Sequence, residues 1–322
     1  MKAIVADRPG GPEVLHPMEM DIPIPGPGEL LVKVAACGLN PVDYKIRKGY
    51  LSQQREYPAI LGYDVCGQVE EVGMGAPFAP GDQVYYFANL ARQGAYAEYH
   101  VVASDIVDFK PENLTPVEAA SLPLAGVTVI QALFAKARLQ PMERVLVMGA
   151  AGGVGSLAIQ MAAWKGAEVI GVCSTANMEY ARRLGADHVI DYSTTDVAEE
   201  VARITGGDGA DVALDLVGGE SFAHCVDCMG EGGRLVFLNA FALWEKQLME
   251  TMNKARLKNL AILCELVRNS GEDLRMLSFL ARKGFVKPQV NQVIDLGHVA
   301  EGHRRLESMR GRGKIVIDMS ND

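Results

Sequence analysis

Apolar and polar positions change their spacing near residue 120, and this change divides the chain into two parts. Before that point, short runs of alternating or β-branched residues are separated by Pro and Gly, a pattern typical of β-strands joined by turns. The predicted strands are Lys2–Ala6, Glu29–Cys37, Val65–Val72, Gln83–Ala88 and Ala95–Val102. We therefore expect a compact β domain over residues 1–120.

After about Ala119, helical and extended patterns alternate along the chain. The predicted helices are Ala125–Ala135, Ser156–Lys165 and Met178–Leu184, and the predicted strands are Val145–Met148, Val169–Val172, His188–Ile190, Asp211–Leu216 and Arg234–Asn239. A polar, Met-rich helix is expected after Phe241, and Lys314–Met319 is expected to return as a strand to the β domain. Such alternation predicts a doubly wound α/β domain with a parallel sheet.

One glycine-rich turn carries the strongest chemical signal in the chain. The apolar run Val145–Met148 ends in Gly-Ala-Ala-Gly-Gly-Val-Gly, residues 149–155, which leads directly into a predicted helix. Dinucleotide-binding βα units use such a turn, because Gly152 lets the backbone approach a pyrophosphate and Gly155 lets the helix pack closely on the sheet. The free amides and positive dipole of the helix start favour phosphate. Ala150 replaces the first glycine of the usual pattern, so a tight structural turn stays open as an alternative.

Composition narrows the class of protein. The chain has 322 residues, 49% of them hydrophobic, which is enough for two domains with full cores. A net charge of -9 without a long basic run argues against a nucleic-acid partner. No uninterrupted run of about 18 apolar residues occurs, and Asp7, Arg8 and Pro9 stand where a secretory signal would need an apolar core. We therefore expect a cytoplasmic protein without a membrane partner.

The cysteines indicate neither a disulfide framework nor a metal site. Six of them are scattered along the chain, and in the cytoplasm they are expected to be reduced thiols. Only Cys225 and Cys228 form a CxxC pair, and they lie inside the helical pattern Ser221–Met229 with His224 as the one neighbouring ligand candidate. We interpret the pair as part of a helix face.

Several short segments together suggest a family. They are Met1–Val5, Cys37–Asp43, Leu61–Gly67, Gly81–Val84, Gly94–Glu98, the turn at residues 150–155, and Gly313–Val316. With these segments the chain resembles the zinc-free quinone oxidoreductases of the medium-chain dehydrogenase/reductase superfamily over nearly its whole length. The resemblance implies a GroES-like catalytic domain from residues 1–120 plus 265–322, and a Rossmann domain from residues 121–264. It also implies a nicotinamide coenzyme in the cleft and a homodimer.

The resemblance also bears on zinc. Zinc-dependent alcohol dehydrogenases of the superfamily use a Cys, a His-Glu pair and a later Cys or Asp as ligands. This chain keeps Cys37 but has Tyr63 and Asp64 in place of the pair, and a phenol with a short carboxylate does not make the nitrogen and sulfur site that catalytic zinc prefers. The segment Val84–Ala95 lacks the cysteines of a structural zinc lobe. We therefore expect no metal and interpret Cys37 as a small buried residue.

The end of the second strand of the α/β pattern favours NADPH. NAD-selective folds carry an acidic residue there, which accepts hydrogen bonds from the ribose. This chain has Cys173, Ser174 and Thr175 there, and no acidic residue lies between Cys173 and Glu179. A 2′-phosphate would therefore meet hydroxyl groups instead of a repelling carboxylate.

The resemblance assigns further coenzyme contacts. Ser174 and Tyr192 match positions that contact the 2′-phosphate, whereas Asn177 stands where the family frequently has lysine. Thr128 and Val217 are expected to flank the nicotinamide, and Asn239 to approach its carboxamide. The expected coenzyme-binding residues are Thr128, Gly152, Gly153, Val154, Gly155, Ser174, Asn177, Tyr192, Val217 and Asn239.

The absence of a metal ligand set restricts the substrate. Hydride attack on a quinone or an α,β-unsaturated carbonyl spreads charge into an enolate, which hydrogen bonds stabilise and a phenol, ammonium or water protonates. The candidate catalytic residues are Asn40, Lys45 and Tyr63, although Asn40 could simply order the turn before Pro41 and Lys45 could be a surface charge. We expect an NADPH-dependent reductase of quinones or α,β-unsaturated carbonyls. The alternatives are a zinc-dependent alcohol dehydrogenase and a low-turnover NADPH-binding sensor or structural protein.

Overall fold

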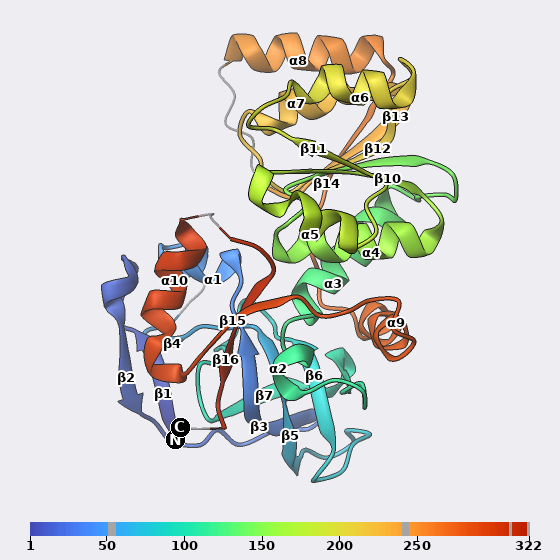
Figure 1. Cartoon of the computed structure of the whole chain (residues 1–322). Helices are drawn as coiled ribbons and strands as arrows, with labels where there is room; N and C mark the ends of the chain where they lie inside the picture. The colour runs from blue at the N-terminus through green and yellow to red at the C-terminus, as the bar shows by residue number, and fades with distance from the viewer. Residues whose placement is uncertain (51–55, 240–244, 309–310, 321–322) are drawn as a thin grey trace. The chain divides into compact units, whose positions relative to one another are not determined.

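The computed structural model describes residues 1–50, 56–239, 245–308 and 311–320, and the chain divides into two compact units (Figure 1). The first unit comprises Met1–Val127, Asn269–Gly284 and Pro288–Asp322, and the second comprises Thr128–Arg268 and Phe285–Lys287. The first boundary falls inside a helix, α3 (Pro123–Val129), rather than at residue 120. A continuous helical pattern carries no sequence signal for such a boundary.

The first unit is built mainly from antiparallel strands. They are β1 (Lys2–Ala6), β2 (Leu15–Glu19), β3 (Glu29–Gly38), β4 (Ala59–Ile60), β5 (Asp64–Val72), β6 (Gln83–Phe87), β7 (Tyr99–Ala103), β8 (Val107–Phe109), β15 (Val290–Ile294) and β16 (Lys314–Asp318). One sheet has the order β2-β1-β4, and the other has the order β15-β16-β3-β5-β6-β8 with β7 also paired to β3. Ile317 of β16 faces Cys37 of β3, which confirms that the last strand returns to the β domain.

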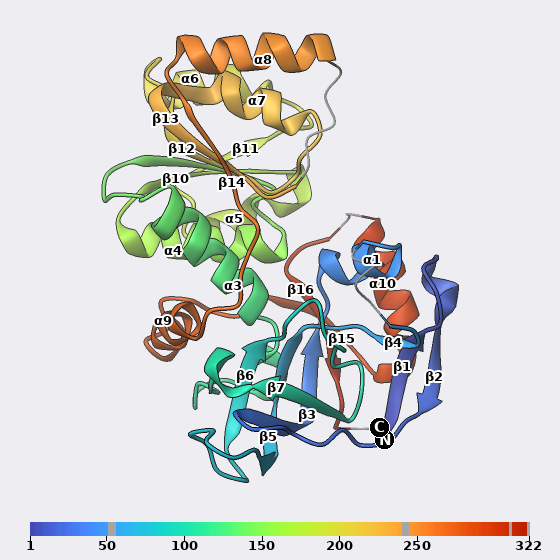
Figure 2. The ribbon, with the colours of Figure 1, turned by 180° about the vertical axis from the view of Figure 1, so that it is seen from behind.

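Short helices connect these strands. They are η1 (Pro12–Val14), α1 (Pro41–Arg47), η3 (Ser104–Ile106), α2 (Pro116–Ala119), α9 (Gly271–Arg282), η6 (Leu296–His298) and α10 (Val299–Glu307). Helix α1 starts at Pro41, whose fixed φ and missing N–H suit a first helical position. Asp43 accepts the Asn40 N–H at 2.8 Å and so satisfies a backbone donor at this helix start. Helices α1 and α10 lie side by side in both views, although they are far apart in the sequence (Figure 1, Figure 2).

The second unit is a doubly wound α/β domain, as the sequence predicts. Its strands are β9 (Arg144–Met148), β10 (Glu168–Cys173), β11 (His188–Asp191), β12 (Ala210–Asp215), β13 (Met229–Phe237) and β14 (Ala261–Cys264). They pair in parallel in the order β11-β10-β9-β12-β13-β14. The helical elements are η4 (Ile130–Lys136), α4 (Gly153–Lys165), η5 (Thr175–Asn177), α5 (Met178–Arg183), α6 (Val197–Thr205), α7 (Ser221–Cys228) and α8 (Glu245–Leu257). Figure 1 and Figure 2 show α4 and α5 on one face of the sheet and α6, α7 and α8 on the other.

The central strands of this sheet are buried on both faces, which explains their continuous apolar sequence. Val145, Leu146 and Val147 of β9 are fully buried. The CxxC pair belongs to α7, and both Cys225 and Cys228 pack into the core of this unit, so the helix-face interpretation is confirmed. Burial raises the pKa of the Cys228 thiol to about 12, which makes it a poor nucleophile at neutral pH.

Several predicted element boundaries were wrong. The strand expected over Arg234–Asn239 is β13, which already begins at Met229 and ends at Phe237. The strand expected over Ala95–Val102 begins only at Tyr99. The residues before it form a loop, in which the Tyr96 N–H donates to the Leu61 carbonyl O at 2.8 Å. The helix expected from Ser156 already begins at Gly153. Its first turn contains Gly153 and Gly155, and because glycine has a low helix propensity the sequence pattern predicted a later start.

One apolar helical segment is also more prominent than the sequence suggests. Within the described residues, Pro116–Lys136 is long and apolar enough, by length and composition alone, to cross a membrane. Its most apolar window is 78% buried inside the protein, as in the core helix of a globular protein. A search for uninterrupted apolar runs passes over this segment because polar residues such as Glu118 and Gln131 lie within it.

Candidate coenzyme site and candidate active site

The glycine-rich turn of the second unit contains glycines with two different requirements. A Cβ built on Gly155 would lie 2.3 Å from the Gly149 carbonyl O, so the turn itself requires glycine there. A Cβ on Gly152 would meet that oxygen at 3.5 Å, an ordinary contact, and no other described atom within 4 Å. The fold therefore does not require glycine at residue 152. Helix α4 begins at Gly153, directly after this residue, and the free amides of a helix N-terminus favour phosphate.

The other predicted coenzyme residues follow the carboxyl ends of neighbouring strands. These residues are Ser174 after β10, Tyr192 after β11, Val217 after β12 and Asn239 after β13. Parallel strands place their carboxyl ends at one edge of the sheet, where α/β domains bind ligands. The Tyr192 and Val217 side chains are 60% and 53% exposed, so this edge presents large apolar groups to a ligand. Thr128 is buried in α3, at the boundary between the units.

A carboxylate that the sequence analysis missed shapes this edge. Asp215, the last residue of β12, is fully buried. Its Oδ1 accepts the Val217 N–H at 3.0 Å, the Gly218 N–H at 3.1 Å and the Ser221 hydroxyl at 2.9 Å. The Asn239 amide donates to the Leu216 carbonyl O at 2.7 Å from the neighbouring strand end. Together these bonds hold the loop that presents Val217.

In the first unit, Asn40 is part of a buried charged cluster. Its Nδ2 donates to Asp64 Oδ2 at 2.8 Å, and its Oδ1 accepts from Lys314 Nζ at 2.5 Å. Lys314 Nζ also lies 2.9 Å from Asp64 Oδ2, and the second Asp64 oxygen accepts the Leu124 N–H at 2.6 Å. All the charged groups of this cluster are buried. Both polar ends of the Asn40 side chain are therefore used in holding α1, β5 and β16 together.

A second buried hydrogen-bond network begins at Asp43, in the first turn of α1. Asp43 Oδ2 accepts the Tyr96 hydroxyl at 2.8 Å, and that hydroxyl lies 3.1 Å from His303 Nε2. Arg47 NH1 lies 3.1 Å from His303 Nδ1, and Arg47 also forms a salt bridge with Glu307. Because a guanidinium only donates, His303 Nδ1 must accept and its Nε2–H must donate to the Tyr96 hydroxyl oxygen.

Burial and neighbouring charges shift the pKa values of two residues in this network. Burial raises the pKa of Asp43 to about 7, against the opposing effect of its hydrogen bonds. Burial and the Arg47 charge lower the pKa of His303 to about 3, so this imidazole is neutral at physiological pH. The network connects α1, the loop that contains Tyr96, and α10. The sequence analysis missed it because its residues are far apart in the sequence.

The remaining catalytic candidates differ in exposure. Tyr63 is fully buried and directly precedes Asp64 at the start of β5. Lys45 lies on the exposed side of α1, and partial burial lowers its pKa from the ordinary value. Asn40, Lys45 and Tyr63 all belong to the first unit, whereas the predicted coenzyme residues belong to the second.

The residues at the family's zinc position do not suit a metal ion. Cys37 is buried, and burial together with the Asp43 and Asp64 charges raises the pKa of its thiol well above the ordinary value. Asp64 already has the Lys314 ammonium at 2.9 Å, where a second cation would be repelled. Among the residues that the structure describes, no group of three or more His, Cys, Asp or Glu side chains is placed to hold a metal.

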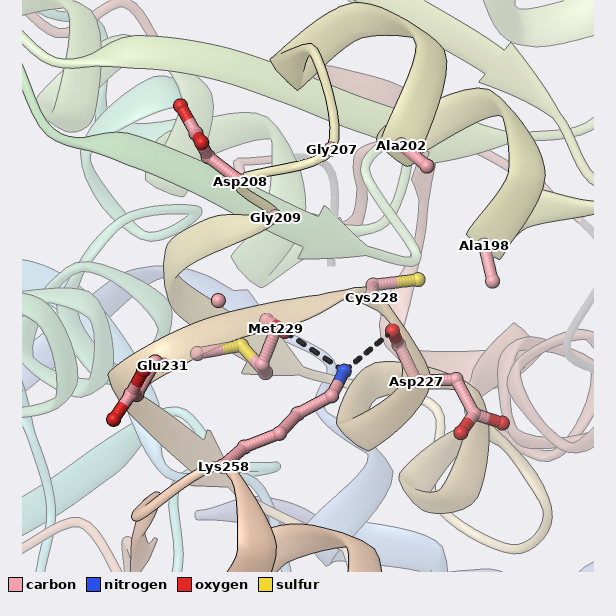
Figure 3. A pocket seen from close by; sticks show the side chains of 11 residues that line it. Ala198, Ala202, Gly207, Asp208, Gly209, Asp227, Cys228, Met229, Glu231 and Lys258 are labelled. Carbon is pink, nitrogen blue, oxygen red and sulfur yellow. Dashed lines mark hydrogen bonds between the residues drawn. The ribbon is translucent and has the colours of Figure 1, made fainter.

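A separate cavity of about 200 Å³ lies at the opposite, amino edge of the second unit's sheet (Figure 3). It is lined by residues that include Gly209 before β12 and Met229 at the start of β13. Lys258 Nζ donates to the carbonyl oxygens of Val226, Asp227 and Met229 at 3.0, 2.8 and 2.8 Å. This ammonium therefore satisfies the last carbonyls of α7 and stabilises the negative end of the helix dipole. Its role is structural, away from the edge that carries the coenzyme candidates.

Comparison with known proteins places the chain in a family. Residues 26–112 match the family described as "Alcohol dehydrogenase GroES-like domain", and residues 153–282 match "Zinc-binding dehydrogenase". The quinone oxidoreductase of Rattus norvegicus is 31% identical, with 98% of this chain and 97% of the relative covered.

Solved structures show the same relationship. A structure described as an NAD-dependent alcohol dehydrogenase is 34% identical with a TM-score of 0.94, covering 99% of this chain and 100% of that one. The Escherichia coli quinone oxidoreductase complexed with NADPH is 30% identical with a TM-score of 0.89, with the same coverage of 99% and 100%.

The fold, the glycine-rich turn and these relationships define a class: the chain belongs to the medium-chain dehydrogenase/reductase superfamily. Within that superfamily it is of the quinone oxidoreductase type, and it is an NAD(P)H-dependent oxidoreductase. The resemblance and the fold class expected from the sequence are both confirmed.

Proposed function

We propose that this protein is an NADPH-dependent, zinc-independent reductase of quinones or other α,β-unsaturated carbonyls. The observation that carries the proposal is the Lys314 ammonium, 2.9 Å from the Asp64 carboxylate at the family's zinc position. The Lys314 ammonium balances the negative charge of Asp64, as a bound metal cation would. Substrate activation must then come from hydrogen bonds and proton donors, which suffice for conjugated carbonyls because their transition-state charge is delocalised.

The choice of NADPH rests on the adenosine end of the proposed site. The strand β10 ends in Cys173, and Ser174 follows it with a hydroxyl that lies 3.3 Å from Asn177 Nδ2. No carboxylate stands at the end of β10 itself, where NAD-selective domains carry one. The exposed Tyr192 phenol is the second proposed contact of the 2′-phosphate.

The chemistry assigns different roles to the three candidates of the first unit. When bound, the reduced nicotinamide supplies the hydride. Tyr63 is proposed to donate a hydrogen bond or a proton to the developing enolate oxygen, with the Lys45 ammonium as the alternative donor. Asn40 is proposed as a positioning residue, since its amide bonds to Asp64 and Lys314.

Tyr63→Phe tests the proposed donor. Removing a general acid typically costs about 10²–10⁴ in rate, so kcat for an enone should fall by at least about a hundredfold while the Kd for NADPH stays unchanged. Tyr86→Phe is a matched control, because Tyr86 is another fully buried phenol and bonds to His100 at 3.0 Å. Equal kcat for Tyr63→Phe and the wild type, with Lys45→Gln impaired, would transfer the donor role to Lys45.

One relationship favours a second candidate, a zinc-dependent alcohol dehydrogenase. The solved structure described as an NAD-dependent alcohol dehydrogenase aligns with this chain at a TM-score of 0.94. Against this candidate stands the donor set of Cys37, Tyr63 and Asp64, which lacks the imidazole and the free carboxylate of a zinc site.

The deciding experiment follows NADPH oxidation optically with 1,4-benzoquinone, 9,10-phenanthrenequinone, an alkyl vinyl ketone and a saturated aldehyde. Turnover of the first three that is insensitive to chelator and faster than with NADH is the expected result. Turnover of the aldehyde alone, abolished by chelator, would establish the zinc-dependent alternative. Tight NADPH binding without turnover of any acceptor would establish the low-turnover sensor or structural protein.

We also propose a homodimer that pairs through the second unit. Among the described residues, strand β14 ends the order of its sheet and no further strand pairs with its outer edge, and Leu266 just beyond it is 64% exposed. Light scattering at micromolar concentration should give the mass of a dimer, and Leu266→Lys should reduce it towards that of a monomer. A monomeric wild type would overturn the proposal.

A further inference from the structure

Asp191 brings a fixed negative charge to the edge where the coenzyme's adenosine end is proposed to bind. It is the last residue of β11, and in the parallel pairing it stands directly opposite Cys173, the last residue of β10. Ser174, the proposed contact of the 2′-phosphate, follows Cys173, and Tyr192 follows Asp191. The carboxylate therefore lies between the two strand ends that carry these proposed contacts.

Hydroxyl and amide donors hold this carboxylate in place. Its Oδ1 accepts the Ser193 N–H at 3.0 Å and the Ser193 hydroxyl at 2.6 Å, and its Oδ2 accepts the Thr175 hydroxyl. The side-chain hydrogen bond from Ser193, followed by that from Thr175, keeps the pKa of Asp191 below its ordinary value. Asp191 is therefore an anion throughout the neutral pH range.

The same contacts remove a donor from the coenzyme site. Because the Thr175 hydroxyl proton points to Asp191, this hydroxyl cannot donate to a phosphate at the same time. Asn177, at the position where the family frequently has lysine, offers a neutral amide that donates to Ser174 Oγ at 3.3 Å. Within the described residues, no lysine or arginine forms a salt bridge with Asp191.

A carboxylate at this place acts differently on the two coenzymes through its charge. It repels a 2′-phosphate, which carries about -1.5 to -2 charges at neutral pH. A ribose with free hydroxyls carries no charge and avoids this repulsion, although Asp191 is buried and its oxygens already accept from Ser193 and Thr175. Here the acid belongs to the neighbouring strand, so the end of β10 by itself gives an incomplete account of the electrostatics.

We propose that Asp191 is a specificity-determining residue that weakens the preference for NADPH, so that the protein binds NADPH and NADH with affinities within about tenfold of each other. This inference rests on the proposed coenzyme site and concerns the strength of its selectivity. It does not depend on which hydride acceptor is reduced or on whether a metal is needed.

Calorimetric titration of the full chain with 2′,5′-ADP and 5′-AMP tests the charge effect without turnover. At low ionic strength, where screening is weak, the wild type should bind the two nucleotides with Kd values within about tenfold. Asp191→Asn should raise the preference for 2′,5′-ADP by about fivefold, because one like charge is removed. Glu231→Gln is the matched control, since it removes the same charge from an exposed residue at the amino edge of the sheet. Its preference should equal that of the wild type.

A second variant covers a folding defect in the first. Asp191→Ser keeps an acceptor for the Thr175 and Ser193 hydroxyls and should shift the preference in the same direction, with thermal unfolding recorded for each protein. An unchanged preference in the folded variants, or a wild-type preference for 2′,5′-ADP above about 100-fold, would overturn the role of Asp191 while leaving the coenzyme site in place. Binding of neither nucleotide would overturn the proposed coenzyme site and this inference together.

Discussion

Gly152→Ala and Gly155→Ala add the same methyl group at two positions of one turn, and the structure predicts opposite consequences. At Gly155 the new Cβ would lie 2.3 Å from the Gly149 carbonyl O and 2.9 Å from the Ala150 Cα. These are backbone atoms, so β9 and α4 must move apart. At Gly152 the new Cβ would lie 3.5 Å from the Gly149 carbonyl O, an ordinary van der Waals contact.

The expected magnitudes follow from these distances. Overpacking typically costs about 1–3 kcal/mol, and a clash with backbone places Gly155→Ala near about 3 kcal/mol of lost stability. Gly152 has a φ of -71°, which alanine adopts freely, so the entropy gain of about 0.4–1 kcal/mol from a stiffer unfolded chain applies. Alanine is a poorer N-cap than glycine, which offsets that gain. The stability of Gly152→Ala should therefore lie within about 1 kcal/mol of the wild type.

Two measurements separate the effects. Urea denaturation followed by circular dichroism reports stability, and calorimetric titration with NADPH reports affinity. Gly152→Ala should keep the wild-type midpoint but bind NADPH at least about tenfold more weakly, because the methyl fills the space for the pyrophosphate. Wild-type affinity in Gly152→Ala would refute the placement of the pyrophosphate at this turn. Wild-type stability in Gly155→Ala would refute the steric reasoning.

Two further predictions concern the buried polar groups of the first unit. Lys314→Met should destabilise the protein by about 3–5 kcal/mol, since it leaves the Asp64 carboxylate buried without its cation. The double variant Lys314→Met with Asp64→Asn should lose less stability, because no charge is then left buried alone. Equal urea denaturation midpoints for Lys314→Met and the wild type would contradict this. Burial and the Arg47 charge lower the pKa of His303 from 6.5 to about 3 in the folded protein, so the unfolded state binds the proton first and stability is lost as pH falls from 6.5 towards 3. The stability difference between the wild type and His303→Gln, measured by urea denaturation from pH 7 to pH 4, should shift against the wild type as pH falls, and a constant difference would count against the burial of a neutral imidazole.

The local sequence predicted most elements of the second unit and its glycine-rich turn, whereas α6 (Val197–Thr205) and β14 (Ala261–Cys264) were not predicted. The fully buried residues of β9 form a continuous apolar run because both faces of the strand are covered, and that run is visible without any structure. The glycines of residues 149–155 likewise report a local backbone requirement, so they predicted the βα turn directly. The structure then separated the glycine that packing requires, Gly155, from the one that it leaves free for a ligand, Gly152.

Only the tertiary structure decided the partners of the buried charges. Asn40 suggested a donor to substrate, but its amide bonds to Asp64 and to Lys314, which is 274 positions away in the sequence. Arg47 and His303, 256 positions apart, meet because α1 packs beside α10. Periodicity and turn chemistry report neighbours within a few residues, whereas these contacts depend on how strands and helices pack. The sequence alone therefore determined the fold class and the glycine-rich turn, and long-range packing decided which charged groups neutralise one another.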